Sequence, residues 1–171
     1  MVTPRRLSLV VLVVSAVLGL VTGATLVVLA TGPEPLGEVS VEKSADPEAL
    51  RVLRAWDGLR SRAYARADGA ALASLYAPGS RAGAADLAVL RGYRERGLRV
   101  TGMRTQVLSA TVLRQSERRI ELLVTDVLVD AVASDGDRMR WSLPHDRPST
   151  RRVVLVRVDR TWRVAEAYVA D

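Results

Sequence analysis

Residues 46–66, DPEALRVLRAWDGLRSRAYAR, decide the architecture of the folded part of this chain. Asp46 suits a helix N-cap, Pro47 suits the first helical position, and Glu48 adds a favourable negative charge to the first turn. The apolar side chains that follow fall within one half of a helical wheel: Leu50, Leu53, Trp56, Leu59, Ala63, Tyr64 and Ala67. The stretch therefore predicts a long opening helix with a broad face directed at a core.

One charged side chain interrupts that apolar face. Arg60 projects from its middle, where a guanidinium must either reach solvent or meet an acid. Asp57 lies one helical turn earlier and is the nearest acid in the sequence. If Arg60 meets an acid, Asp57 is therefore the nearest candidate.

Two shorter helices are expected next. Asp68 and Gly69 begin a short helix that carries Leu72, Leu75 and Tyr76, and residues 77–80, APGS, end it. A third helix is predicted over residues 82–96, with Gly97 as its stop. Its apolar face consists of Leu87, Leu90 and Tyr93.

After Gly97 the hydrophobic period changes from that of helices to that of strands. The stretches rich in β-branched residues are 107–113, 120–132, 153–158 and 162–169. Asp135-Gly136 indicates a tight hairpin, residues 159–161 indicate another turn, and Pro144 and Pro148 bound an irregular loop. Helices first and strands afterwards predict an α+β fold, with the helices packed on a curved antiparallel sheet.

The N-terminal part of the chain has a different character. Residues 7–30, LSLVVLVVSAVLGLVTGATLVVLA, carry no charge, and a helix of this length measures about 36 Å, enough to cross a hydrocarbon layer of about 30 Å. Arg5 and Arg6 precede it and Glu34 follows it, so the N-terminus is expected in the cytoplasm. We predict a cytoplasmic tail (1–6), a transmembrane helix (7–30), an extended linker rich in Gly, Pro and Glu (31–45) and an extracytoplasmic domain (46–171) of a single-pass cell-membrane protein.

A cleaved signal peptide is the alternative to this anchor, because residues 28–30, VLA, suit a cleavage site. The apolar core of a signal peptide is about 7 to 15 residues long, so the longer run here favours a retained anchor. Inside the span, Ser15, Gly19 and Gly23 recur at every fourth position and form a stripe of small side chains. This stripe is compatible with an unpaired span, in which small residues are common, and with close helix pairing, as in a homodimer.

Composition excludes several functions. The chain has no Cys, which excludes disulfides, thiolate metal sites and an N-terminal lipid attached to Cys. His145 is the only histidine, so we interpret it as a loop residue and expect no metal and no cofactor. The formal net charge is +6, but no interleaved aromatic set accompanies the arginines, so we expect no nucleic-acid partner. An excess of arginine remains compatible with anionic lipid or acidic wall polymer, and equally with scattered solvated charges.

The folded part of the sequence resembles the nuclear-transport-factor-2-like superfamily, whose members have a cone fold. The likeness rests on the long opening helix, the short helix DGAALASLY followed by APGS at residues 68–80, and the closing strands with Trp162-Arg163-Val164, and it covers about residues 47–171. An anchor helix before such a domain also resembles the mammalian-cell-entry-associated membrane proteins of high-GC bacteria. The superfamily contains enzymes, ligand binders and catalytically silent domains.

The resemblance directs attention to acids inside the cone, where ketosteroid isomerases and polyketide cyclases hold a catalytic acid. Asp126 and Asp130 are the candidates, since alternation places them on one strand face with Leu122, Val124 and Leu128. The alternative is that these acids pair with Arg60 or with an arginine of a neighbouring strand. The side chains expected to line a pocket are Trp56, Arg60, Tyr64, Trp162 and Tyr168.

Three functions follow. The leading hypothesis is a non-catalytic, membrane-anchored domain that binds an envelope protein partner or a small apolar ligand. The second is an isomerase- or cyclase-like enzyme with an Asp base. The third is a binder of anionic lipid or wall polymer that works by charge alone.

Overall fold

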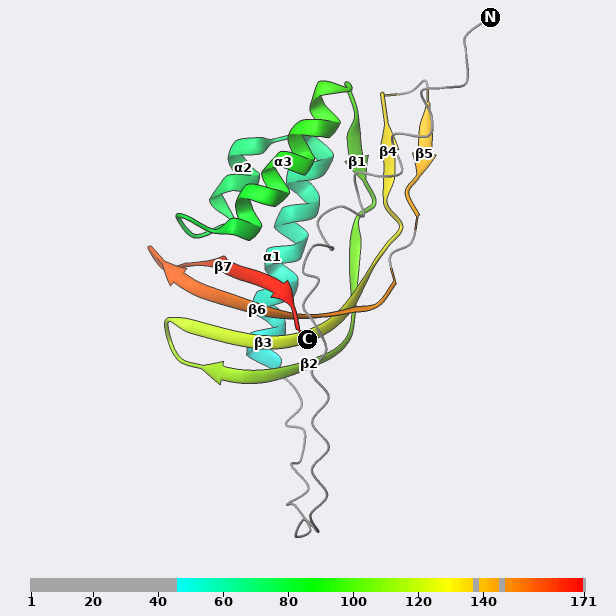
Figure 1. Cartoon of the computed structure of the whole chain (residues 1–171). Coiled ribbons are helices and arrows are strands. Elements are labelled where there is room, and N and C mark those ends of the chain that lie inside the picture. The colour runs from blue at the N-terminus through cyan, green and yellow to red at the C-terminus, as the bar shows by residue number, and fades with distance from the viewer. Residues whose placement is uncertain (1–45, 137–138, 145–146, 171) are drawn as a thin grey trace, which may run out of the picture.

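The computed structural model describes residues 46–136, 139–144 and 147–170 (Figure 1). Its helices are α1 (Pro47–Arg66), α2 (Gly69–Ser74) and α3 (Arg81–Glu95). Each begins at a side-chain cap, since Asp46, Asp68 and Ser80 accept hydrogen bonds from backbone N–H groups of the first turn. The three predicted helices are confirmed, including the end of α1 at Arg66.

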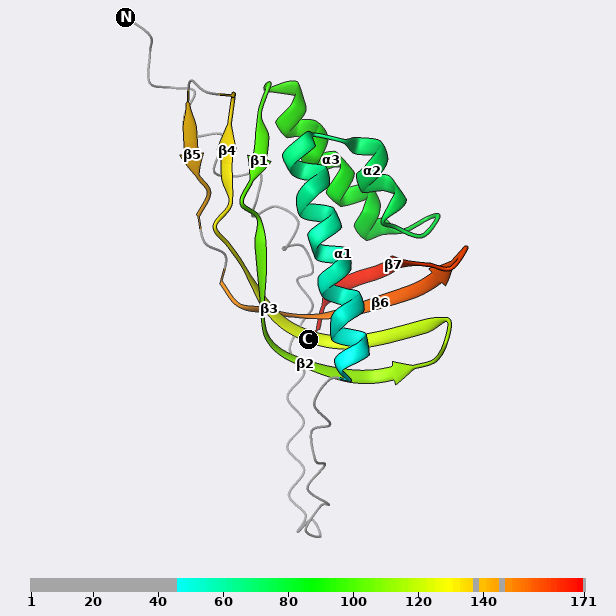
Figure 2. The same ribbon diagram turned by 180° about the vertical axis from the view of Figure 1, so that it is seen from behind.

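Antiparallel strands form two sheets, and the chain passes from one sheet to the other and back. The larger has the order β2-β3-β6-β7 and consists of β2 (Arg104–Gln115), β3 (Arg119–Val129), β6 (Ser149–Val158) and β7 (Thr161–Val169). The smaller has the order β1-β4-β5 and consists of β1 (Arg99–Thr101), β4 (Val132–Ser134) and β5 (Arg140–Ser142). Figures 1 and 2 show that β1 leads into β2 and β3 into β4, so the two sheets form one bent surface.

The bend falls at Gly102, between β1 and β2, and at Asp130, between β3 and β4. Both residues have a positive φ, 71° and 60°. A Cβ on Gly102 would lie 2.4 Å from the backbone oxygen of Asp130, so only glycine allows the strands to approach this closely. The strand predicted over residues 120–132 is therefore interrupted at Asp130, which corrects its length.

The helices cover the concave face of the bent surface, as Figure 2 shows from the helix side. The side chains buried between the two layers include Leu53, Tyr64, Leu72, Leu90, Ile120, Leu122, Val124, Leu155 and Val164. The predicted α+β fold, with helices on a curved antiparallel sheet, is confirmed. The predicted face of α1 is partly wrong, because Leu59 is 44% exposed whereas Ala49 and Val52 are buried. The buried face of α1 consists of Ala49, Val52, Leu53, Ala63 and Tyr64, and Leu59 lies outside it.

The predicted turns also occur. Asp135 and Gly136 begin the connection from β4 to β5, part of which lies outside the described residues, and Asp159 and Arg160, both with positive φ, connect β6 to β7. The sequence reading missed β1 and β5 because three-residue strands show too little alternation.

The predicted membrane anchor lies outside the described residues, as do the tail, the linker, the Ser15, Gly19 and Gly23 stripe and His145. Within residues 46–136, 139–144 and 147–170, no helix combines the length and the apolar character that a membrane span requires.

Candidate functional site: a cavity with two buried ion pairs

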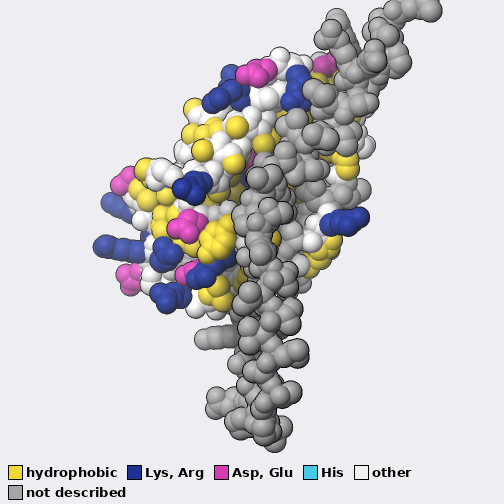
Figure 3. Space-filling model, viewed as in Figure 1, with side chains coloured by type: hydrophobic (Ala, Val, Ile, Leu, Met, Phe, Trp, Pro, Cys, Tyr) yellow, Lys and Arg dark blue, Asp and Glu magenta, His cyan; other side chains and the backbone are white. Residues whose placement is uncertain are grey.

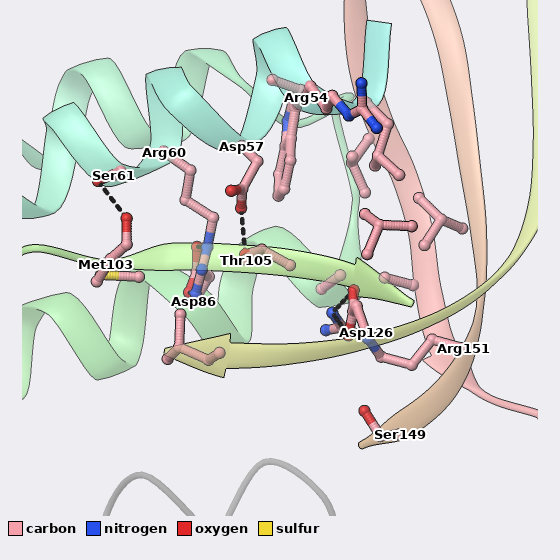
Figure 4. Close-up of a pocket in the computed structure, with 18 of the residues that line it drawn as sticks. Arg54, Asp57, Arg60, Ser61, Asp86, Met103, Thr105, Asp126, Ser149 and Arg151 are labelled. Carbon is pink, nitrogen blue, oxygen red and sulfur yellow. Dashed lines mark hydrogen bonds and ion pairs between the residues drawn. The ribbon is translucent and has the colours of Figure 1, made fainter. Parts of the chain in front are cut away.

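A cavity of about 630 Å³ lies between α1, α3 and the concave face of the sheet. Its size is typical of sites for small molecules. The apolar part of its lining includes Leu53, Trp56, Val89, Met103, Val107, Leu128, Val153, Val164 and Ala167. The charged part consists of Arg54, Asp57, Arg60, Arg62, Asp86, Arg104, Asp126, Arg147 and Arg151. On the face that Figure 3 shows, arginines and acids lie side by side around exposed apolar surface. Figure 4 shows Asp57 and Arg60 projecting from α1 toward the strands, with Asp126 and Arg151 on the sheet side.

The first ion pair joins Arg60 of α1 to Asp86 of α3. Nε and Nη2 of Arg60 donate to the two carboxylate oxygens of Asp86 at 2.7 and 2.6 Å, in a bidentate arrangement. The hydroxyls of Tyr64 and Tyr76 each donate to one of the same oxygens, both at 2.7 Å. The carboxylate of Asp86, a residue only 9% exposed, therefore accepts four hydrogen bonds.

The pKa values follow from this arrangement. Burial by itself raises the pKa of Asp86, but the hydrogen bonds and charge of Arg60 and the two tyrosine hydroxyls outweigh burial and leave it below its ordinary value of 3.8. Burial, together with the adjacent Asp86 carboxylate, raises the pKa values of Tyr64 and Tyr76 well above the ordinary value. Asp86 is therefore a stable anion and both tyrosines keep their protons.

The expected partner of Arg60 is thus wrong. Asp57 accepts a hydrogen bond at 2.7 Å from the hydroxyl of Thr105 on β2. Arg60 instead contacts Asp86 on α3, which is remote in sequence but lies within reach of its long side chain.

The second ion pair joins Arg151 of β6 to Asp126 of β3. Both oxygens of Asp126 contact the same nitrogen, Nη2 of Arg151, at 2.6 and 2.5 Å. Nε of Arg151 is buried and has no hydrogen-bond partner among the described residues. Burial raises the pKa of Asp126, the charge and hydrogen bond of Arg151 lower it without compensating fully, and the nearby charge of Asp57 raises it further.

The predicted pocket residues occupy several positions. Trp56, Arg60 and Tyr168 line the cavity, whereas Tyr64 and Trp162 are not among its lining residues. Trp56 donates from its indole N–H to the backbone oxygen of Leu75 at 2.9 Å. Tyr64 acts one layer deeper, on Asp86, and Trp162 is only partly buried against the core.

The two acids predicted on β3 separate in the structure. Asp126 is 6% exposed and lines the cavity. Asp130 lies at the bend, where it forms an ion pair with Arg104, its side chain is 53% exposed, and it is not among the lining residues. The break in the strand explains the difference, because alternation no longer holds at Asp130.

Sequence reasoning missed Asp86, Tyr76 and Arg151 as members of the site. A signal for Asp86 was present, since it precedes Leu90 by four positions and Tyr93 by seven and so lies on the apolar stripe of α3. Arg151 likewise precedes Val153 by two positions and shares the inner face of β6 with it. In both segments the sequence signal was a charged residue in line with apolar residues that face the core.

Metal ligation has no support in the described part of the chain, in which no three His, Cys, Asp or Glu side chains are grouped to hold an ion. The acids of the cavity are instead matched with arginine or with the Thr105 hydroxyl.

Comparison with known proteins gave similarity in structure only. No family model matches the chain, and no curated protein matches it. The chain is similar to Aln2 from a Streptomyces species, at 15% identity and a TM-score of 0.50 over 74% of this chain and 93% of that one. It is also similar to the intermembrane space region of the chloroplast protein ARC6 (17% identity, 74% and 97% covered, TM-score 0.49). An NTF2-like protein with a cystatin-like fold from Novosphingobium aromaticivorans follows (16% identity, 72% and 83% covered, TM-score 0.43).

At such low identity the likeness concerns the fold alone. The likeness to Aln2 supports the predicted arrangement of helices on a curved antiparallel sheet. Activity has to be argued from the cavity itself.

Proposed function

We propose that the domain binds a small, partly apolar molecule in the cavity and that residues 7–30 hold it at the outer surface of a cell membrane. The observation that carries the proposal is a cavity of about 630 Å³ with a largely apolar lining, in which both buried acids already have an arginine partner. Such a site can enclose an apolar body and orient a polar group.

The pairing of the acids favours binding over catalysis. A general base needs a lone pair that is free to accept a proton from the substrate. Asp86 accepts four hydrogen bonds, and both oxygens of Asp126 contact Arg151. The charges of these groups stabilise one another before any ligand arrives.

The membrane location is supported by the sequence. The uncharged run over residues 7–30 is long enough to span, and Arg5 and Arg6 favour a cytoplasmic N-terminus. A reporter fused after Asp171 should be active only outside the cytoplasm. A mature N-terminus at Thr31, detected by mass spectrometry, would contradict the anchor.

Cavity filling tests the binding function. The full chain in lipid nanodiscs should enhance the fluorescence of the apolar probe N-phenyl-1-naphthylamine beyond the signal of empty nanodiscs. Ala167→Phe places a ring in the cavity and should remove most of this enhancement, whereas Ala55→Phe, at an exposed position of α1, should not. Equal enhancement by the two variants, at unchanged melting temperature, would contradict binding in this cavity.

An acid–base enzyme is the second candidate, and the position of Asp126 favours it. A carboxyl group in a cavity with a raised pKa can exchange a proton near neutral pH more readily than an ordinary one. Asp126→Asn would then abolish activity in a fully folded protein, measured as failure to complement the phenotype of gene deletion. Complementation by this variant would exclude Asp126 as a base.

A further inference from the structure

The two arginines of the cavity differ in the donors that they leave unused. Arg60 applies Nε and Nη2 to Asp86, whereas Arg151 contacts Asp126 through Nη2 alone. Within the described residues, Nε of Arg151 is buried and has no hydrogen-bond partner, which costs free energy until an acceptor arrives. Nε of Arg163 is also unpartnered there, but Arg163 is not among the residues that line the cavity.

Ligand can reach Arg151 through the cavity. Its side chain lines the cavity and keeps 35% of its surface exposed, compared with 22% for Arg60. The carboxylate of Asp126 is also held less firmly as an anion than that of Asp86, because burial raises the pKa of Asp126, whereas the contacts of Asp86 with Arg60 and two tyrosines lower its pKa. Pairing Arg151 with an anionic ligand therefore costs less free energy than pairing Arg60 with one.

The rest of the lining favours an anion. Arginines outnumber acids around the cavity, and within the described residues no ion pair joins Arg54 or Arg62 to an acid. Positive potential of this kind attracts negatively charged ligands and raises their local concentration. The negative charge of Asp57 reduces this positive potential. Among the described residues Asp57 pairs with no arginine, and it accepts its hydrogen bond from the Thr105 hydroxyl.

The shape of the guanidinium specifies the anionic group. Its planar fork of N–H donors matches the two coplanar oxygens of a carboxylate, which can bind side-on to Nε and an adjacent terminal nitrogen. The apolar side chains that line the same cavity, including Val107, Val153 and Val164, suit a hydrocarbon or aromatic body. Building on the proposed function, we propose that Arg151 anchors the carboxylate of an apolar organic acid bound in the cavity.

Matched probes test this anchor. Octanoate and 1-octanol share a chain and differ in the carboxylate, and 2-naphthoate replaces the chain with an aromatic body. Calorimetric titration of the full chain in nanodiscs, with empty nanodiscs subtracted, should give octanoate binding about tenfold tighter than 1-octanol. The ratio of octanoate to 2-naphthoate affinity then distinguishes an aliphatic acid from an aromatic one.

Conservative variants locate the effect. Arg151→Lys keeps the positive charge beside Asp126 but removes Nε and the planar fork, so the preference for octanoate over 1-octanol should fall to about twofold or less. Arg152→Lys is the matched control, because the neighbouring side chain pairs with Glu121 and is not a lining residue. It should keep the wild-type preference.

The Asp126→Asn variant gives the sharpest expectation. It removes the competing carboxylate and should tighten octanoate binding by about tenfold while leaving 1-octanol unchanged. An equal preference in the wild type and in Arg151→Lys, or weaker octanoate binding by Asp126→Asn with an unchanged melting temperature, would overturn the anchor. If N-phenyl-1-naphthylamine binds and neither carboxylate does, the anchor is overturned and the cavity function remains. If none of the probes binds, both proposals are overturned.

Discussion

The cavity has two ends that use the same kinds of residue in opposite ways. At the α3 end, Arg60, Tyr64 and Tyr76 fill the hydrogen-bonding capacity of Asp86 and hold its pKa below the ordinary value. At the β6 end, Arg151 offers Asp126 a single nitrogen, and burial holds the pKa of that acid above it. A buried ion pair thus stabilises a fold when its partners are saturated, and is available for exchange with a ligand when they are not.

The largest expected effect is at the saturated end. Asp86→Asn leaves Arg60 buried without a counter-ion and presents an amide N–H₂ to tyrosine hydroxyls that donate hydrogen bonds. We expect a loss of about 3–5 kcal/mol in the free energy of unfolding of residues 46–171, measured by urea denaturation. A loss below about 1 kcal/mol would show that this end is not the structural one.

A smaller effect is expected from the glycine that positions Tyr76. A Cβ on Gly83 would lie 2.6 Å from Cγ of Tyr76, so Gly83→Ala must displace the ring that donates to Asp86. We expect a loss of about 1–3 kcal/mol by the same measurement. Gly92→Ala in the same helix is the control, because its Cβ meets only the end of the Arg96 side chain and should add about 0.5–1 kcal/mol of stability. If both substitutions stabilise the domain, the position of Tyr76 is not constrained by Gly83.

Asp126→Asn should change stability by less than about 1 kcal/mol. Burial raises the pKa of this carboxyl group, so replacing its ionised form by a neutral amide costs less than the same replacement at Asp86, where the pKa is lowered. A loss as large as that of Asp86→Asn, in parallel urea titrations, would remove the distinction between the two ends.

The pH dependence of these variants gives the smallest and most diagnostic signal. Because the pKa of Asp86 is lower in the folded than in the unfolded state, this carboxylate is protonated first in the unfolded chain as the pH falls. The contribution of Asp86 to stability is therefore lost as the pH falls below 3.8 and through the folded-state pKa. The raised pKa of Asp126 gives the opposite pH dependence, because the folded state keeps its proton to a higher pH than the unfolded state. The contribution of Asp126 to stability therefore falls as the pH rises above 3.8 and through the folded-state pKa.

Two difference curves test these signs. The stability of the wild type relative to Asp86→Asn should shrink toward acid, and its stability relative to Asp126→Asn should grow toward acid. Urea titrations at pH values from about 3 to 7 supply both curves. Parallel slopes would contradict the assignment of opposite pKa directions.

Sequence alone predicted the local parts of this molecule well. The caps at Asp46 and Asp68, the stop at Gly97 and the turn at Asp135-Gly136 are short-range signals, and the helices and hairpins follow them. The partner of Arg60 was predicted incorrectly because Asp86 lies 26 positions away, and only the packing of α1 on α3 brings the two together. Asp126 was found through alternation on β3, while the same rule failed at Asp130 because a positive φ interrupts the strand there.

The close approach of Gly102 to the backbone of Asp130 bears on which ligands such a domain can accept. The residues that follow Gly102 are Met103, Arg104 and Thr105, which all line the cavity. Any side chain at position 102 would push two strands apart and carry that wall outward, while Gly102 itself does not line the cavity. The capacity of the site is therefore set by a position that never meets a ligand, so a single substitution there could alter the range of molecules accepted without changing the groups that recognise them.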